Sequence, residues 1–138
     1  MYKILFVDDE PVIADTLATI FKLSGYDATA VYSCEEAIEI IDANHPLFIV
    51  ADVVMPGMNG VDLAKLVYNI YPDSGILLFS GNATTPALLE AADAEGFHFD
   101  LMTKPVTPSE LLRKVGLFCS TQQPMDNMPL LVGEPAQA

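Results

Sequence analysis

Short apolar runs alternate along the chain with longer stretches in which apolar residues recur every three or four positions. The runs predict five strands, at residues 3–7, 27–31, 47–51, 75–79 and 98–102. Runs such as ILFV, LFIVA and ILLF contain no polar position. Uninterrupted apolar runs of this length are typical of parallel strands that are buried on both faces of a sheet.

The stretches between the strands predict helices, because helix signals stand at their ends. Pro11 suits a first helical turn, and Gly25 suits the left-handed residue just past the end of that helix. Ser33 and Glu36 have the spacing of a capping box at the start of the second helix. The signals that open or close the later helices are Thr85-Pro86, Gly96 and Thr107-Pro108-Ser109-Glu110.

The first three helical stretches also have an apolar face that can pack against a sheet. The residues expected to point inward are Ile13, Leu17, Ile20, Phe21, Ile38, Ile41, Leu63, Leu66, Val67 and Ile70. Five strand–helix units in a row imply an α/β fold, a doubly wound five-stranded parallel sheet with helices on both faces and right-handed crossovers. We predict the common strand order for such a sheet, 2-1-3-4-5.

The length of the chain places these units in one domain. The chain has 138 residues, and we assign residues 1–119 to the domain and residues 120–138 to a C-terminal tail. The tail holds three prolines and several glutamines but no Lys or Arg. Its residues 128–132, with the letters MPLLV, form an apolar segment that could dock onto a protein surface.

Charge and hydropathy argue against two classes of partner, nucleic acids and membranes. Six Lys and Arg residues against 19 Asp and Glu residues give a net charge of −13, so we expect no nucleic acid partner. No apolar run has the roughly eighteen residues of a membrane span, and the N-terminus has no signal-peptide pattern. We therefore expect no membrane contact and a cytoplasmic location. The two cysteines, Cys34 and Cys119, lack metal-ligand spacing and are expected to be free thiols.

Acidic residues stand at the ends of two predicted strands. Asp8, Asp9 and Glu10 come directly after the first strand, and Asp52 follows the third. In the predicted order these strands are neighbours at the switch point, where open α/β sheets have their sites. Two carboxylates about 4 Å apart repel each other by roughly 4 kcal/mol at an effective dielectric constant of about 20. A hard divalent cation removes that penalty, so the cluster predicts a Mg²⁺ site used in phosphate chemistry.

Two more predicted strand ends face the same crevice. The fourth strand is followed by Ser80 and Gly81, which place a hydroxyl group beside a residue without a side chain. The fifth is followed by Thr103, Lys104 and Pro105, and the Lys104 ammonium group would pair with a carboxylate and later with a phosphoryl oxygen. A single Asp, Ser or Lys at a strand end is most often a cap or a solvated residue. The complete set indicates a site for phosphoryl chemistry.

Taken in order, these residues resemble the receiver domain of two-component response regulators, of the stand-alone single-domain type. The matching motifs are Val7-Asp8-Asp9-Glu10, Asp52, Met55-Pro56-Gly57-Met58-Asn59-Gly60, Ser80-Gly81 and Lys104-Pro105. Each motif is weak alone, but the ordered set is highly specific and covers the chain up to about Cys119. The resemblance implies a flavodoxin-like fold and a phosphorylatable protein of two-component, or phosphorelay, signal transduction.

The resemblance also implies a role for each site residue. Asp52 would be the phosphoacceptor, which takes a phosphoryl group from a histidine kinase or a histidine phosphotransfer protein. Asp9 would be the main direct Mg²⁺ ligand, and Asp8 would act largely through metal-bound water. Asp52 itself and the backbone carbonyl of Val54 would complete the protein's share of the metal site.

Ser80 and Lys104 would each bind a phosphoryl oxygen, and the bond between Lys104 and Pro105 is a candidate for the cis form. Many receivers carry Tyr or Phe three residues before the lysine, where this chain has Leu101. The chain therefore lacks the usual switch aromatic. We expect the loop after Ser80 and the helix that follows it to change on phosphorylation, with Leu101 as passive filling.

The resemblance implies signalling through partner binding and no enzyme activity beyond self-phosphorylation and self-dephosphorylation at Asp52. The downstream target would be a protein, and a phosphorylation-dependent homodimer is a further expectation. The alternatives are a Mg²⁺-dependent aspartyl phosphohydrolase, a flavodoxin-like carrier and a receiver-like scaffold that is never phosphorylated. The features against them, in turn, are the single acid of Asp52-Val53-Val54, the lack of a phosphate loop after the first strand, and the complete acid cluster.

Overall fold

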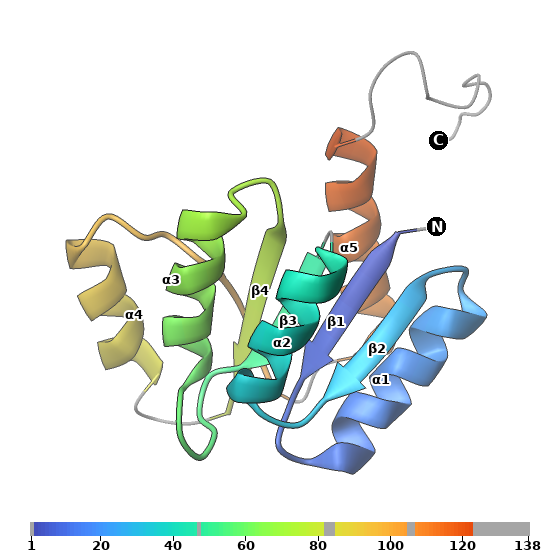
Figure 1. The fold of residues 1–138 in the computed structure, drawn as a ribbon, viewed down its shortest axis with the longest axis horizontal. Coiled ribbons are helices and arrows are strands. Elements are labelled where there is room, and N and C mark those ends of the chain that lie inside the picture. Colours follow the sequence, from blue (N-terminus) through green and yellow to red (C-terminus); the bar gives the residue numbers. More distant parts are fainter. Residues whose placement is uncertain (1, 47, 82–84, 105–106, 123–138) are drawn as a thin grey trace.

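The computed structural model of the protein describes residues 2–46, 48–81, 85–104 and 107–122, in which five strands and five helices alternate (Figure 1). The strands are β1 (Lys3–Val7), β2 (Asp27–Val31), β3 (Phe48–Asp52), β4 (Gly75–Ser80) and β5 (Asp100–Thr103). The helices are α1 (Pro11–Leu23), α2 (Cys34–Asn44), α3 (Gly60–Ile70), α4 (Thr85–Ala94) and α5 (Pro108–Gln122).

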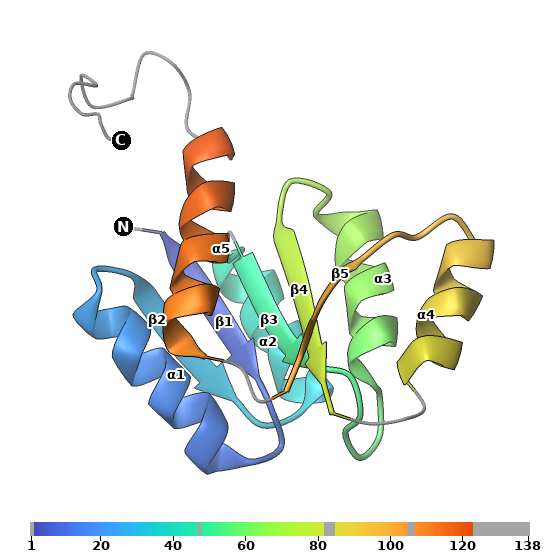
Figure 2. The same cartoon turned by 180° about the vertical axis from the view of Figure 1, so that it is seen from behind.

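The strands form one parallel sheet in the order β2-β1-β3-β4-β5, which confirms the predicted fold class and strand order. Helices α1 and α5 cover one face of this sheet, and α2, α3 and α4 cover the other (Figures 1 and 2). The switch point therefore lies between β1 and β3, where the strand order reverses.

The sheet divides the apolar core into two clusters. Along β1, Leu5 and Val7 pack with residues of α2 and α3, whereas Ile4 and Phe6 pack with residues of α1 and α5. All five residues of β3 are buried, as expected for a central parallel strand that is covered on both faces. This packing holds the carboxyl ends of β1 and β3 side by side.

Three strands have boundaries that differ from the predicted ones. Strand β3 includes Asp52 and β4 includes Ser80, so each of these polar residues ends a strand rather than following one. Leu47, predicted as the first residue of the third strand, lies outside the described residues. Strand β5 begins at Asp100 instead of His98 and ends at Thr103.

Aromatic packing accounts for the late start of β5. The rings of Phe97 and Phe99 stack on each other, with centroids 5.8 Å apart, and both pack against the core cluster on the α3 and α4 side. The segment before Asp100 therefore packs against the core and does not pair with β4. The alternating pattern of apolar residues continues through it, which is why the sequence alone predicts a longer strand.

The predicted helix signals mostly have the expected geometry. Helix α1 begins at Pro11, and Gly25 adopts the left-handed conformation with a φ of 98°. Ser33 Oγ accepts a hydrogen bond from the Glu36 backbone N–H at 3.1 Å, but the Glu36 carboxylate accepts one from Tyr32, one residue earlier than in a standard capping box. The expected inward position of Ile70 is wrong, because this last residue of α3 is exposed.

Helix α5 runs to Gln122, three residues beyond the predicted end of the domain. The remaining residues, 123–138, lie outside the described part of the chain, so the division into domain and tail stays a prediction. Cys34 and Cys119 are both buried and form no disulfide. Among the described helices, none has the length and apolar character needed to cross a membrane.

Candidate functional site

Three carboxylates meet at the carboxyl ends of β1 and β3. Asp8 and Asp9 follow β1, and Asp52 is the last residue of β3. One side-chain oxygen of each lies within 4.8 Å of an oxygen of the other two. Asp8 and Asp52 are buried, whereas Asp9 is exposed. The three residues can therefore present oxygen atoms to one cation, with Asp9 on the solvent side.

Lys104 reaches the carboxylates from the end of β5. Its Nζ donates a hydrogen bond to Oδ2 of Asp52 at 3.0 Å and lies 3.6 Å from Oδ2 of Asp8. Burial lowers the pKa of Lys104, but the hydrogen bond to Asp52 and the surrounding negative charges outweigh burial and raise the pKa above its ordinary value. Lys104 therefore stays charged and neutralises part of the acidic cluster.

Asp8 is the most deeply buried of the three acids, with 1% of its surface exposed. Its Oδ1 accepts a hydrogen bond from the Glu10 backbone N–H at 2.9 Å. Its Oδ2 is buried and has no hydrogen-bond partner within the described part of the chain. Burial raises the pKa of Asp8, and the negative charge of Asp52 adds to this effect. A buried carboxylate oxygen without a hydrogen bond, beside two other carboxylates, fits a cation ligand better than a structural cap.

A cavity of about 360 Å³ opens over this cluster. The residues that line it are Asp9, Glu10, Asp52, Val54, Ser80, Gly81 and Lys104. Ser80 ends β4, is buried, and accepts a backbone hydrogen bond from Lys104 N–H at 3.0 Å. With Asp8 directly beside the cavity, the structure brings together all the site residues that the sequence analysis identified.

Two residues of the site received no role from the sequence. Glu10 lines the cavity, and its position after two acids was the available signal. The second is Phe79. The Lys104 ammonium group lies 5.3 Å from the centre of the Phe79 ring, within the range of a cation–π contact. That contact could not be found from the pattern, because an apolar residue in a buried strand is expected for packing alone.

The loop after β3 holds the backbone of Asp52 in place. The Val53 N–H donates to the Phe79 carbonyl at 3.1 Å, and the Gly60 N–H donates to the Val53 carbonyl at 2.8 Å. A Cβ atom on Gly60 would lie 2.2 Å from the Asp52 carbonyl oxygen, so only glycine fits at this close approach. Asn59 caps α3 by accepting a hydrogen bond from the Asp62 N–H at 2.8 Å.

Comparison with known proteins identifies the family. The family model of the response regulator receiver domain matches residues 4–116, which is most of the chain and includes every site residue described above. The chain belongs to this family. The predicted resemblance to receiver domains is therefore confirmed.

Curated relatives of this receiver include the DNA-binding response regulator MtrA of Mycolicibacterium smegmatis. The two sequences are 28% identical over 113 residues, which are 82% of this chain and 48% of MtrA. MtrA of Mycobacterium tuberculosis is 27% identical over the same shares of the two chains. The receiver chain thus spans about half the length of these curated relatives. The DNA binding in the name of MtrA refers to the MtrA proteins themselves.

Solved structures agree on the fold. The receiver domain of the Francisella response regulator 1452 is 26% identical, with a TM-score of 0.76, over 89% of this chain and 100% of that one. The response regulator protein TrrA from Thermotoga maritima, solved in complex with Mg²⁺–BeF, is 26% identical, with a TM-score of 0.73, over 86% and 99%. A CheY-like receiver from Methanospirillum hungatei reaches a TM-score of 0.79 at 23% identity, over 88% and 96%.

The receiver places Leu101 differently from our expectation. Leu101 lies opposite Leu78 in the β4–β5 register, but its side chain is 38% exposed. It lies at the surface and therefore does not fill space in the core, and its passive role in the switch stays a prediction. Pro105, named as a candidate cis proline, and residues 82–84 of the loop after Ser80 lie outside the described residues.

In metal-free buffer at about pH 7, we expect Asp8→Asn to stabilise the receiver by about 1 kcal/mol, because the variant no longer buries a carboxylate charge close to the charge of Asp52. Asparagine has the same shape and keeps an oxygen that can accept from the Glu10 N–H. Because folding raises the Asp8 pKa above its ordinary value of 3.8, the folded state holds this proton more tightly. The resulting stabilisation is complete below the ordinary pKa and is lost as the pH rises through the folded-state pKa.

Urea unfolding in EDTA, measured from about pH 4 to about pH 7, tests this linkage. The stability of the wild-type protein should fall with rising pH more steeply than that of Asp8→Asn. Asp73→Asn, which changes an exposed acid away from the site, is the matched control and should follow the wild type. A variant less stable than the wild type at about pH 7 would show that the Asp8 charge is a net benefit.

Proposed function

We propose that this receiver accepts a phosphoryl group on Asp52 with Mg²⁺ bound, as a component of two-component phosphorelay signalling. The observation that carries the proposal is the contact at 3.0 Å between Lys104 Nζ and Asp52 Oδ2 inside a cluster of three carboxylates. Asp52 thereby has a cation on one side and two candidate metal ligands nearby. It also borders the cavity through which a phosphoryl group would enter.

The donor set fits Mg²⁺, which prefers carboxylate and water oxygens in an octahedral shell. Exposed Asp9 would bind the ion directly, and buried Asp8 would act largely through a metal-bound water. Asp52 and the backbone carbonyl of Val54, which also lines the cavity, would complete the protein's share. When bound, the ion would neutralise charge on the transferred phosphoryl group. The complex of the relative TrrA with Mg²⁺–BeF supports the same use here.

The transfer itself needs positioning and charge neutralisation more than covalent chemistry from the protein. An Oδ atom of Asp52 would form a bond to the phosphorus atom of a phosphohistidine. The P–N bond would break, and the ring nitrogen would leave with the electron pair. Lys104 and the Ser80 hydroxyl group would each hold one phosphoryl oxygen of the resulting acyl phosphate.

The partners we propose follow from this chemistry. The phosphodonor would be a histidine kinase or a histidine phosphotransfer protein in the cytoplasm, and the output would be binding of a downstream protein or of a second phosphorylated copy. We propose no enzyme activity on other substrates, because Asp52 is followed by Val53 and Val54. A phosphohydrolase of similar build would use a second acid there for proton transfer.

Incubation with acetyl phosphate and Mg²⁺, followed by intact-mass measurement, tests the proposed function. We expect the wild-type chain to gain one phosphate in Mg²⁺ and none in EDTA. A chain that gains no phosphate in Mg²⁺, although it binds the ion, would overturn the proposal and favour the scaffold that is never phosphorylated. Turnover of generic phosphate esters would favour the phosphohydrolase.

Asp9→Ala should remove Mg²⁺ binding and labelling together, because the exposed carboxylate is the proposed direct ligand. At a Mg²⁺ concentration 100 times the Kd, the wild-type protein should gain about 2.7 kcal/mol of stability, and the variant should gain almost none. Calorimetric titration and thermal unfolding with and without Mg²⁺ measure the two effects. Asp73→Ala, which removes an exposed acid away from the site, should respond like the wild type. Unchanged Mg²⁺ affinity in Asp9→Ala would place the ion elsewhere.

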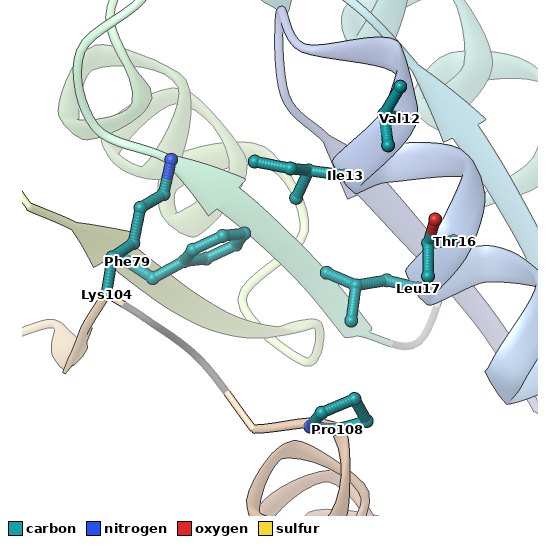
Figure 3. Close-up of a pocket in the computed structure, with 7 residues that line it drawn as sticks. All are labelled: Val12, Ile13, Thr16, Leu17, Phe79, Lys104 and Pro108. Carbon is teal, nitrogen blue, oxygen red and sulfur yellow. The ribbon is translucent and has the colours of Figure 1, made fainter.

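An apolar groove of about 620 Å³ lies beside the acid cavity, between α1, β4 and the start of α5 (Figure 3). Its lining residues are Val12, Ile13, Thr16, Leu17, Phe79, Lys104 and Pro108. Lys104 borders both the groove and the acid cavity. A protein that brings a phosphohistidine to Asp52 must cover this rim. We therefore propose the groove as the docking surface for the phosphodonor.

Val12→Asp should slow phosphotransfer from a histidine kinase by about tenfold, a loss of roughly 1.4 kcal/mol of docking energy. Val12 is 77% exposed in α1, so the charge changes the surface without disturbing the core. Labelling by acetyl phosphate should stay at the wild-type rate, because a small donor needs no docking surface. Leu23→Asp, an equally exposed apolar position at the other end of α1, is the matched control. Equal slowing in both variants would contradict docking at the groove.

A further inference from the structure

Another hollow lies at the end of the sheet opposite the acid cavity, where β4 extends beyond β5. Pairing of these strands begins with Leu77 opposite Asp100, so Gly75 and Ile76 have no β5 partner among the residues described. A cavity of about 350 Å³ opens at this place, which we call the sheet-edge notch. Its lining residues are Phe48, Gly75, Ile76, Leu77, Asp100, Lys114, Leu117 and Phe118.

Aromatic and aliphatic side chains form the walls of the sheet-edge notch. The rings of Phe48 and Phe118 pack edge to face with centroids 5.0 Å apart. Both rings lie against Gly75, where a Cβ atom would come within 2.6 Å of one and 2.8 Å of the other. Leu117 is 57% exposed beside them on α5. The late start of β5 therefore leaves apolar surface open to solvent, at a cost that an apolar occupant would remove.

We propose that residues 128–132 of the same chain, MPLLV, occupy the sheet-edge notch. Helix α5 ends at Gln122, four residues and about 6 Å of helix rise beyond Phe118. The six residue steps from Gln122 to Met128 can span up to about 20 Å, enough to turn back to the notch. The groove beside α1 is bordered by Pro108, about 21 Å from Gln122 along the helix, and is at the limit of that reach.

Charge complementarity favours the same occupant. The segment is flanked by Asp126 and Glu134, and residues 123–138 contain no Lys or Arg. Lys114 on α5 and Asp100 on β5 line the sheet-edge notch on two different elements, so the α5 side of the notch is the positively charged one. Cations are scarce in this chain, which has six Lys and Arg residues against 19 acids, so Lys114 in the lining of the notch favours an acid-flanked apolar segment. The proposal does not depend on phosphorylation of Asp52.

Occupation of the sheet-edge notch would give the C-terminal segment a defined role. It would cover Leu117 and the unpaired start of β4, which otherwise form an open sheet edge.

Hydrogen exchange of the full chain, followed by mass spectrometry in the absence of any phosphodonor, tests the proposal. The variant Leu130→Asp/Leu131→Asp places two charges in the segment and leaves the folded domain unchanged. We expect about tenfold faster exchange in residues 75–77 and 114–118 of this variant, because local opening no longer has to release the segment. Helix α1 should exchange as in the wild type.

Two further variants separate this contact from a general effect of charge. Ala136→Asp/Gln137→Asp adds the same charges outside the segment and should exchange like the wild type. Lys114→Glu should weaken protection of residues 75–77, and adding Asp126→Lys should restore it. Identical exchange in the wild type and in Leu130→Asp/Leu131→Asp would overturn the proposal. So would protection that depends on protein concentration, which indicates a second copy, or a change confined to α1, which indicates the other groove.

Discussion

Asp52→Asn should abolish the gain of one phosphate that the wild-type chain shows with acetyl phosphate and Mg²⁺. Asparagine has the same shape as aspartate and keeps an oxygen that can accept the hydrogen bond from Lys104. It lacks the anionic oxygen that attacks phosphorus, so labelling should fall by about 100-fold or more. Because Asp52 is the only acid that the third strand contributes to the cluster, no neighbour can take over its role with the same geometry.

Intact-mass measurement over a time course gives the result directly. Asp73→Asn makes the same chemical change at an exposed position and should label like the wild type. Thermal unfolding separates loss of the acceptor from loss of the fold. The Asp52→Asn variant should be at least as stable as the wild type without metal, because one of several repelling charges is gone. Labelling of Asp52→Asn at the wild-type level would assign the acceptor to another residue.

Gly60→Ala should destabilise the protein by about 3 kcal/mol, a large effect for the addition of one methyl group. The new Cβ atom would lie 2.2 Å from the Asp52 carbonyl oxygen, a backbone atom that cannot rotate away. Either β3 or the start of α3 must shift, and the hydrogen bond from the Gly60 N–H to the Val53 carbonyl would lengthen or break. Because that shift displaces the backbone of Asp52, the rate of labelling should also fall.

Gly116→Ala is the matched control for this substitution. Gly116 lies within α5, and a Cβ atom there would meet the Tyr26 hydroxyl at 3.8 Å, an ordinary contact. Replacing glycine by alanine inside a helix should be neutral or stabilising, by up to about 1 kcal/mol. Urea unfolding of both variants provides the comparison. If Gly60→Ala unfolds at the wild-type urea concentration, the loop after β3 does not hold Asp52 in place.

Much of the fold could be predicted because one physical signal repeats five times. A parallel strand covered on both faces must be apolar along its whole length, so β1, β3 and β4 are visible as runs of letters. The start of β5 could not be predicted in this way. Phe97 and Phe99 continue the apolar pattern, but they stack on each other and pack against the α3 and α4 side. A pattern shows that a side chain is buried, and it does not show which neighbour buries it.

Some features of the candidate site could also be predicted from the sequence, and others could not. Asp8, Asp9, Asp52 and Lys104 could be assigned because charged residues at the ends of apolar strands are conspicuous, and the strand order brings them to one edge. Two features could not be assigned: the Asp8 oxygen that accepts no hydrogen bond from the described residues, and the contact distance at Gly60. Both depend on how closely two backbone segments approach, and this distance is set by three-dimensional packing.

The position of Lys104 on the last strand has a consequence for biosynthesis. The lysine lies 52 residues after Asp52, so a ribosome completes β1, β3 and β4 before it adds the ammonium group that neutralises their acids. Chains grow at about 5–20 residues per second and fold from the N-terminus, which leaves an interval of seconds. During that interval a nascent chain would carry the acidic cluster without its lysine. Repulsion between the carboxylates would then oppose a stable arrangement of β1, β3 and β4 until β5 has been made.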